Sequence, residues 1–149
     1  MAVITTDILL ENAKRDYVFE WLSKPEHHRL ILSNAFANMT ETGAGKFDLT
    51  LDISPKQRVL GYEFTRADGS HGGRRILCKT TGKRTKGDLH YSLRTMKPSK
   101  NTLVTLHMDY EPGRVLGGLM VSMGLQQGLE EAFNKILNNL SSELPRQAK

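Results

Sequence analysis

Hydrophobic and polar residues alternate along the middle of the chain with the two-residue period of β-strands. The clearest case is KFDLTLDI (46–53), in which Phe47, Leu49 and Leu51 face one way and polar side chains face the other. The same period returns in segments separated by short turns rich in glycine, proline and charged residues. The predicted strands are 3–10, a weaker 36–43, 46–53, 58–65, 74–80, 89–96 and 102–110. Short turns between successive strands predict an antiparallel sheet, each strand having one apolar face.

A helical period replaces the strand period in two places. After the first strand, helical spacing of apolar residues predicts two short helices over 16–22 and 26–32, with Asn12 as the cap of the first and Pro25 between them. Near the C-terminus, GRVLGGLMVSMGLQQGLEEAFNKILNNL predicts a helix over about 114–143. This element alone is long enough to cover the apolar faces of all the strands, so the sheet must curl around it.

The long helix changes character along its length. Its second half has one apolar stripe and one polar side, as expected of a helix packed on a core. Its first half is apolar nearly all round, and Gly117, Gly124 and Gly128 align as a stripe of their own. Bare positions leave room for a ligand, for closely packed backbone or for a second copy of the chain. The sequence leaves these three alternatives open.

Length and composition bound the class of protein. A chain of 149 residues with 38% hydrophobic and 25% charged residues can bury one sizeable core. We therefore expect one domain over 1–149, with a frayed tail over 145–149.

The sequence favours a reducing, cytoplasmic setting. The single cysteine, Cys78, excludes an internal disulfide. The N-terminal stretch carries Asp7 and Glu11 where a secretion signal needs an unbroken apolar core. The longest nearly apolar run, 115–125, is too short to span a bilayer, so no transmembrane segment is predicted.

The net charge of +5 is unevenly placed. Between Arg74 and Lys100 the chain has nine lysines or arginines and one acid, Asp88. Such a run can attract nucleic acid, an anionic membrane or an anionic ligand. It can equally be a solvated hairpin whose charges prevent strand edges from pairing. Aromatic residues do not alternate with these charges as they do in single-strand binders, so the sequence favours the solvated hairpin over a ribosomal or RNA-bearing partner.

Motifs of known catalytic and cofactor sites are absent from the sequence. It has no GxSxG, HExxH, P-loop or strand-following GxGxxG, so we predict no cofactor and assign no catalytic residue. The adjacent His27 and His28 would point about 100° apart on a helix, which does not make a bidentate site. His90 and His107 lie on the polar faces of neighbouring predicted strands. That face should be the solvent side, so we predict no metal site there.

The order of elements and two long segments carry a family resemblance. A pattern VF-x-x-L followed by Pro-Glu is present as Val18, Phe19, Leu22, Pro25 and Glu26. Together with the segments 4–27 and 110–140, it resembles the START-like (SRPBCC) superfamily, also called the polyketide cyclase/dehydrase and lipid-transport group or the Bet v 1-like helix-grip fold. The resemblance covers essentially the whole chain. It implies an α+β helix-grip fold, in which a curved antiparallel sheet of six or seven strands wraps around the C-terminal helix, with two short helices after the first strand.

This resemblance implies an internal cavity between sheet and C-terminal helix that holds a hydrophobic small molecule, such as a lipid, sterol, quinone or polyketide. Family members range from enzymes to carriers and receptors, so the fold does not select the chemistry. The leading hypothesis is a non-catalytic binding or carrier protein for a lipid-, quinone- or polyketide-like molecule. The alternatives are a cavity enzyme of the polyketide cyclase/dehydratase type and an adaptor that uses its basic surface.

Candidate ligand contacts are residues expected on the inner faces of the strands and the first half of the helix. They are Tyr62, Arg74, Tyr91, Met108, Tyr110, Leu116, Met120, Met123 and Gly124. A buried phenol needs a hydrogen-bond partner, which a ligand's carbonyl or hydroxyl can supply, although a phenol at a strand end can also reach water. Either Arg74 or Arg75 points inward, and the sequence does not settle which. The one that does would favour an anionic or carbonyl-bearing ligand.

Overall fold

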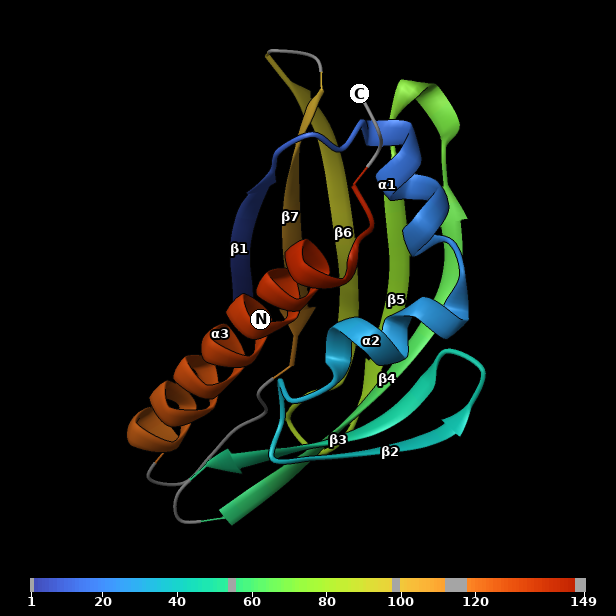
Figure 1. The fold of residues 1–149 in the computed structure, drawn as a ribbon. Coiled ribbons are helices and arrows are strands. Elements are labelled where there is room, and N and C mark those ends of the chain that lie inside the picture. Colours follow the sequence, from blue (N-terminus) through green and yellow to red (C-terminus); the bar gives the residue numbers. More distant parts are fainter. Residues whose placement is uncertain (1, 54–55, 98–99, 112–117, 147–149) are drawn as a thin grey trace.

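The structure is a computed structural model that describes residues 2–53, 56–97, 100–111 and 118–146 (Figure 1). Its strands form one antiparallel sheet of seven, in the order β1-β7-β6-β5-β4-β3-β2. The strands are β1 (Ala2–Leu10), β2 (Asn38–Gly43), β3 (Lys46–Ile53), β4 (Lys56–Asp68), β5 (Arg75–Thr81), β6 (Gly87–Met96) and β7 (Asn101–Tyr110). The helices are α1 (Arg15–Leu22), α2 (His28–Leu32) and α3 (Gly118–Glu143), with short 3₁₀ turns η1 (Pro25–His27) and η2 (Ser70–Gly72).

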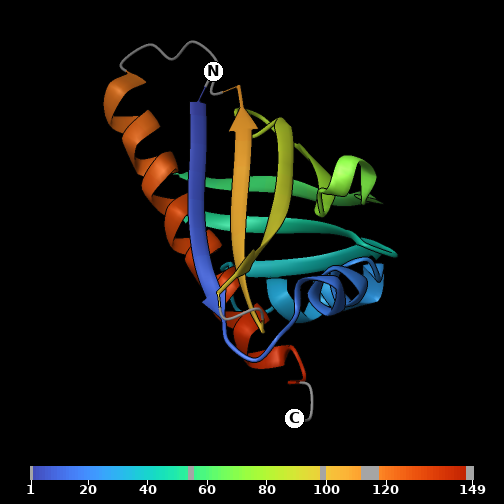
Figure 2. The same cartoon turned by 90° about the horizontal axis from the view of Figure 1, so that it is seen from above.

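The sheet is so strongly bent that the strands near its two edges run across each other (Figure 2). Helix α3 packs against β1, β3 and α2, while α1 packs against β5, β6 and β7. All three helices therefore lie on the concave side of the sheet (Figures 1 and 2). The predicted fold, a curved antiparallel sheet gripping the C-terminal helix with two short helices after the first strand, is confirmed.

The second half of α3 packs as its pattern predicts. Its apolar stripe is buried against the sheet, and the residues on the other side, Glu131, Lys135 and Asn138, are exposed. The stripe consists of Leu129, Ala132, Phe133, Ile136, Leu137 and Leu140. The described part of α3 begins at Gly118, so the predicted start near residue 114 lies outside the described residues. Within the described chain, no helix is both long and apolar enough to cross a membrane.

The prediction that Asn12 caps the first helix is wrong. Helix α1 begins at Arg15, and its N-cap position is held by Lys14, whose side chain makes no capping bond. Asn12 has a φ of 58° and serves instead to turn the chain sharply after β1. The turn presses the buried Ala13 onto the β6–β7 hairpin, where its N–H donates to the Lys100 carbonyl at 2.7 Å.

Two strand boundaries also differ from the pattern. Strand β4 continues to Asp68, past its predicted end at residue 65, and β5 begins at Arg75 instead of residue 74. A bulge between Phe64 and Arg66 lets β4 pass β5 with one extra residue. The added length pairs Asp68 with Arg75, whose side chains also form an ion pair (Nη2 to Oδ2 3.1 Å).

The basic residues of the 74–100 segment are divided between two ends of the sheet. Lys83, Arg84 and Lys86 lie in the connection between β5 and β6. Lys97 and Lys100 lie at the other end of β6, on the β6–β7 hairpin. A ten-residue strand separates the two groups by about 30 Å at about 3.3 Å per residue, so the run of charges in sequence is not one patch in space.

Replacing Gly87 by alanine is expected to destabilise the sheet. A Cβ atom at this position would overlap the Asp109 carbonyl oxygen and the Tyr110 Cα atom, and these backbone atoms cannot move without breaking the β6–β7 pairing. We predict a loss of about 3 kcal/mol, near the upper end of overpacking costs, in the free energy of unfolding measured by urea denaturation. Gly43→Ala is the matched control, because its Cβ first meets the flexible Lys46 side chain at 3.5 Å. Equal effects of the two variants would contradict this packing.

Candidate functional site

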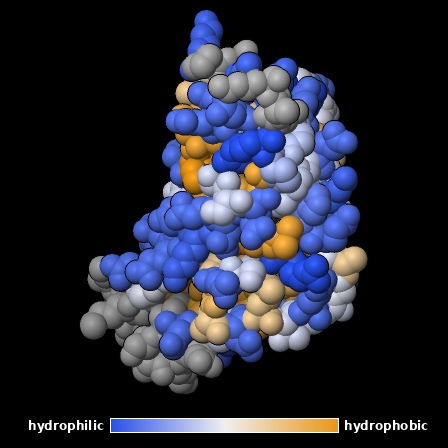
Figure 3. Space-filling model, in the orientation of Figure 1, coloured by the Kyte–Doolittle hydropathy of each residue, from blue (hydrophilic) through white to orange (hydrophobic). Residues whose placement is uncertain are grey.

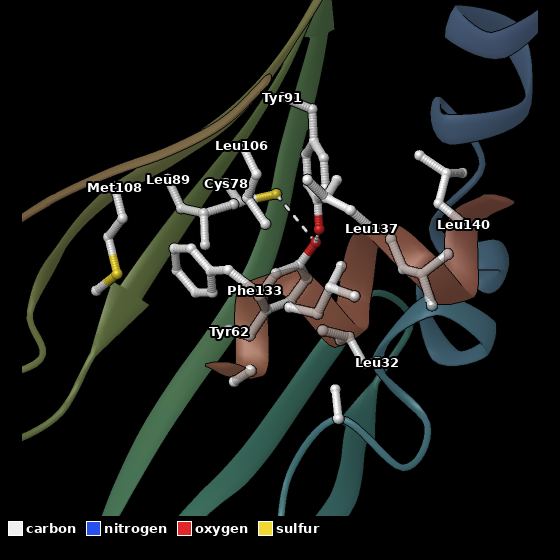
Figure 4. Close-up of a cluster of buried hydrophobic side chains, with 14 of the residues drawn as sticks. Leu32, Tyr62, Cys78, Leu89, Tyr91, Leu106, Met108, Phe133, Leu137 and Leu140 are labelled. Carbon is white, nitrogen blue, oxygen red and sulfur yellow. Dashed lines mark hydrogen bonds between the residues drawn. The ribbon is translucent and has the colours of Figure 1, made fainter. Parts of the chain in front are cut away.

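Three polar rings meet in the interior on the concave side of the sheet. Tyr62 comes from β4, Tyr91 from β6 and His28 from the start of α2, and all are at most 2% exposed. The two tyrosines flank β5, in which Cys78 also points inward, so their hydroxyls meet beside its thiol (Figure 4). Strand alternation thus brings residues 29 positions apart to within a hydrogen bond, Oη to Oη 2.8 Å.

Burial fixes the protonation state of this cluster. Burial lowers the pKa of His28 from 6.5 to about 4, although the hydrogen bond to Leu22 opposes the shift. Burial also raises the pKa of Tyr62 and of Tyr91 well above 10, and the pKa of the Cys78 thiol to about 12. At neutral pH the cluster is therefore an uncharged imidazole, two phenols and a thiol.

The hydrogen bonds of the cluster run in one direction. The Leu22 carbonyl can only accept, so the Nε2 atom of His28 carries the proton of this 2.8 Å bond. Nδ1 of the neutral ring is then an acceptor, and Tyr62 donates to it at 2.6 Å. Tyr62 has no second proton, so Tyr91 donates to the Tyr62 oxygen at 2.8 Å, and the Cys78 thiol donates at 3.5 Å.

The end of α1 anchors the histidines. The last carbonyls of a helix have no partner within it. Nε2 of His28 donates to the Leu22 carbonyl, and Nδ1 of His27 lies 2.7 Å from the Trp21 carbonyl oxygen. The His27 ring also stacks on Trp21, with centroids 4.2 Å apart. The adjacent histidines thus bind neighbouring carbonyls, one outside the core and one within it, and they do not converge on a common ligand.

The role of His28 was not predicted from the sequence, where the adjacent histidines were considered only as metal ligands. A usable signal was present. His28, Ile31 and Leu32 have the i, i+3, i+4 spacing of one helix face, and all three are buried. A histidine that shares the apolar face of a short helix is a buried histidine, and it needs partners for both nitrogens.

Four of the predicted contact residues line the concave side. Tyr62, Tyr91, Met108 and Tyr110 are each at most 2% exposed. Met108 lies farther along the sheet from the two meeting hydroxyls, next to Leu89 (Figure 4). Burial raises the pKa of Tyr110, and Glu130 of α3 adds to this shift. Their contact with a ligand remains a prediction.

Arg74 lies toward α1 and Arg75 toward solvent, which resolves the register that the sequence left open. The Arg74 Nε atom donates to Asp16 at 3.0 Å, and its guanidinium lies 5.6 Å from the centre of the Phe19 ring. Its other hydrogen bonds go to carbonyls of the 69–73 connection. Arg74 therefore joins this connection to α1 at the edge of the interior between the sheet and the helices.

The remaining candidates belong to the first half of the helix predicted from the sequence. Leu116 and Gly117 lie outside the described residues, as do the side chains of Met120 and Met123. Gly124 is half-buried.

Gly128, from the same glycine stripe, borders a groove of about 240 Å³ between α3, the segment 35–37 and β3. On the face that carries α3 and α2, hydrophilic side chains predominate and apolar ones show in small patches between them (Figure 3).

His90 and His107 are direct cross-strand partners on the outer face, with ring centroids 5.0 Å apart. His107 already has two neighbours, since its Nδ1 lies 2.9 Å from the Thr5 hydroxyl and its Nε2 lies 3.2 Å from Asp109 Oδ1. In the part of the chain that the structure describes, no group of three or more His, Cys, Asp or Glu is arranged to hold a metal ion.

No protein-family model matches this sequence, and no curated protein matches it. Solved structures do match. The Zhui aromatase/cyclase from Streptomyces sp. R1128 has a TM-score of 0.66 at 15% identity, over 96% of this chain and 93% of its own. Norcoclaurine synthase from Thalictrum flavum, in complex with dopamine and hydroxybenzaldehyde, has 0.60 at 15%, over 99% and 89%. A START superfamily protein from Mycobacterium smegmatis has 0.56 at 14%, over 94% and 97%.

These neighbours define the class of fold. The chain has the START-like helix-grip fold, and the resemblance predicted from the sequence is confirmed at the level of the fold. Identities of 14–15% leave the activity to be argued from the site itself.

Removing single hydroxyls should show which tyrosine donates the hydrogen bond to His28. Tyr62→Phe leaves Nδ1 of His28 buried without a donor, so we expect a loss of about 3 kcal/mol in the free energy of unfolding. Tyr91→Phe is the matched control, because the Tyr62 oxygen still accepts from Cys78, and we expect about 1 kcal/mol. Urea denaturation of both variants measures the difference. A larger loss of unfolding free energy for Tyr91→Phe than for Tyr62→Phe would contradict the order of donors from Tyr91 through Tyr62 to His28.

The buried imidazole should make stability depend on pH. Below about pH 6.5 the unfolded chain binds a proton at His28, whereas the folded chain binds it only below about pH 4. Stability should therefore fall as the pH drops through this window. The loss due to His28 should be about 2 kcal/mol between about pH 7 and about pH 4.5. His28→Gln removes this part of the dependence, so urea denaturation at both pH values should show a shallower loss in the variant. Equal losses of stability in the wild-type protein and the variant would show that a group other than His28 causes the pH dependence.

Proposed function

We propose that this protein binds an apolar small molecule in the interior between the concave face of the sheet and α3, and carries it. The proposal is based on the buried polar cluster of His28, Tyr62 and Tyr91, which lies on a largely apolar wall. A core that serves stability alone gains little from such groups, because each needs a partner to offset the cost of leaving water. In ligand sites, a few convergent polar groups on an apolar wall orient the bound molecule.

The wall beside the cluster has the chemistry expected for such a ligand. Leu106 is the cross-strand partner of Tyr91, and Leu89 and Met108 form the next inward-facing pair along the sheet; all three are buried and none donates a hydrogen bond. Met108 is adaptable, since its unbranched thioether can fill space in several ways. A lipid-, quinone- or polyketide-like molecule matches a wall of this kind. The fold neighbours support the proposal by analogy, one of them being in complex with two small aromatic molecules.

A cavity enzyme of the cyclase or dehydratase type is the second candidate. The observation that favours it is the His28–Tyr62 pair, in which one imidazole nitrogen is anchored by a carbonyl and the other accepts a phenol proton. This is the arrangement of an acid–base pair, which the sequence alone did not reveal. Against it, a pKa of about 4 makes His28 a weak base at neutral pH, so we place binding first.

Native mass spectrometry of the protein purified from its own host tests the proposal. We expect a bound apolar small molecule that is released on unfolding and is unchanged after prolonged incubation with the protein. Loss of water from the bound molecule would favour the enzyme. Co-purification of RNA in its place, or the absence of a bound molecule together with failure to bind apolar fluorescent probes, would overturn the proposal.

Two variants locate the bound molecule. Met108→Phe enlarges a side chain of the inner wall, so the fraction of protein that carries the molecule should fall. Val3→Phe makes a comparable enlargement on the outer face of β1, where Val3 is 48% exposed, and should leave this fraction unchanged. Native mass spectrometry gives the loaded fraction directly. Equal loading of the two variants would place the molecule elsewhere.

A further inference from the structure

The polar cluster can accept a further hydrogen bond but has no free proton to donate. Each proton in the chain from Tyr91 through Tyr62 to His28 has a partner, and the Leu22 carbonyl fixes the direction of all of them. The Tyr62 oxygen donates once and accepts twice, from Tyr91 and Cys78, so it has nothing left to offer.

Tyr91 is the open end of this chain. Its one proton is committed to Tyr62, yet its own oxygen has acceptor positions that no described residue occupies. Turning this proton toward a ligand would break the 2.8 Å bond to Tyr62, so that exchange brings no net gain. The Tyr91 hydroxyl lies on the side of the sheet that faces α3, the helix that closes the proposed binding space (Figure 4). The cluster therefore presents the Tyr91 oxygen to that space as a hydrogen-bond acceptor.

A second buried polar atom faces the same side of the sheet. The Thr6 hydroxyl on β1 has no hydrogen-bond partner among the described residues. Thr6 pairs with Leu106, which pairs with Tyr91, so the three side chains form one row on the concave face. A buried hydroxyl without a partner calls for an explanation, and a polar atom of a bound molecule is one. A threonine hydroxyl can donate or accept, so it can form a hydrogen bond with a ligand hydroxyl in either role.

We propose that the ligand is an apolar molecule with an alcohol or phenol group, which donates its proton to the Tyr91 oxygen. This inference rests on the proposed binding function and narrows the ligand class. Molecules that only accept, such as esters, ethers and oxidised quinones, bring their lone pairs against those of Tyr91 and gain nothing from the cluster. Phenolic polyketide-like molecules, hydroquinones and sterol-like alcohols carry the required donor.

Two probes of nearly the same shape test the sense of the hydrogen bond. 2-Naphthol has a donor, and 2-methoxynaphthalene has only an acceptor at the same position. We expect wild-type protein to bind 2-naphthol about tenfold more tightly, measured by the fluorescence of each probe. In Tyr91→Phe the ratio of the two affinities should fall by about the same factor. Comparing this ratio between proteins cancels the different affinities of the probes for water. Tyr17→Phe, which removes a hydroxyl that donates to Pro145 outside the cluster, should keep the wild-type ratio.

The outcomes separate the inference from the function on which it rests. If both probes bind equally, or if Tyr91→Phe keeps the preference, the donor assignment is overturned while the binding function stands. If neither probe binds, the binding function is overturned and the inference with it.

A measurement on the unmodified protein does not depend on the variants folding. The ¹⁵N chemical shifts of the His28 ring should show a neutral imidazole with its proton on Nε2. A proton on Nδ1 would reverse the chain of donors and overturn the proposal.

Discussion

Burial of one face of a strongly bent sheet is the constraint on which this structure depends. In six of the seven strands, all but β2, buried apolar side chains point to the same side of the sheet, and this side must be covered by other elements. Helix α3 covers the part near β1 and β3, and α1 covers the part near β5, β6 and β7. The interior is thus closed by helices that lie far apart in the sequence. Among the buried side chains of this interior, a few are polar, and their partners determine how they can be buried.

His28, Tyr62 and Tyr91 can be buried because the C-terminal end of α1 supplies an acceptor for the His28 proton. A histidine and two tyrosines inside an apolar shell would be costly if any nitrogen or oxygen lacked its hydrogen bond. The Leu22 carbonyl, left free where α1 ends, accepts from His28 and so sets the roles of all the groups that follow. An ordinary helix terminus thereby determines the hydrogen-bonding character of a site on the far side of the imidazole.

The fold was predictable from the sequence because its signals are periodic and local. The alternation in 46–53 and the apolar stripe from Leu129 to Leu140 each depend only on neighbouring residues. The turn at Asn12 was not predictable, because it follows from the docking of Ala13 on a hairpin nearly ninety residues away. The inward-facing tyrosines were predicted for the same reason as the strands. Their partner was not, because the alignment of His28 with Tyr62 depends on how α2 sits across the sheet.

The two histidines also connect helices α1 and α2 to each other. His27 and His28 tie the start of α2 to the Trp21 and Leu22 carbonyls at the end of α1. Separating the helices would leave the Leu22 carbonyl without its donor and the Tyr62 proton without its acceptor at once, and it would also remove His27 from the Trp21 carbonyl. We therefore expect helices α1 and α2 to open as one cooperative unit instead of fraying residue by residue. In hydrogen exchange, their amides would then share a common opening free energy.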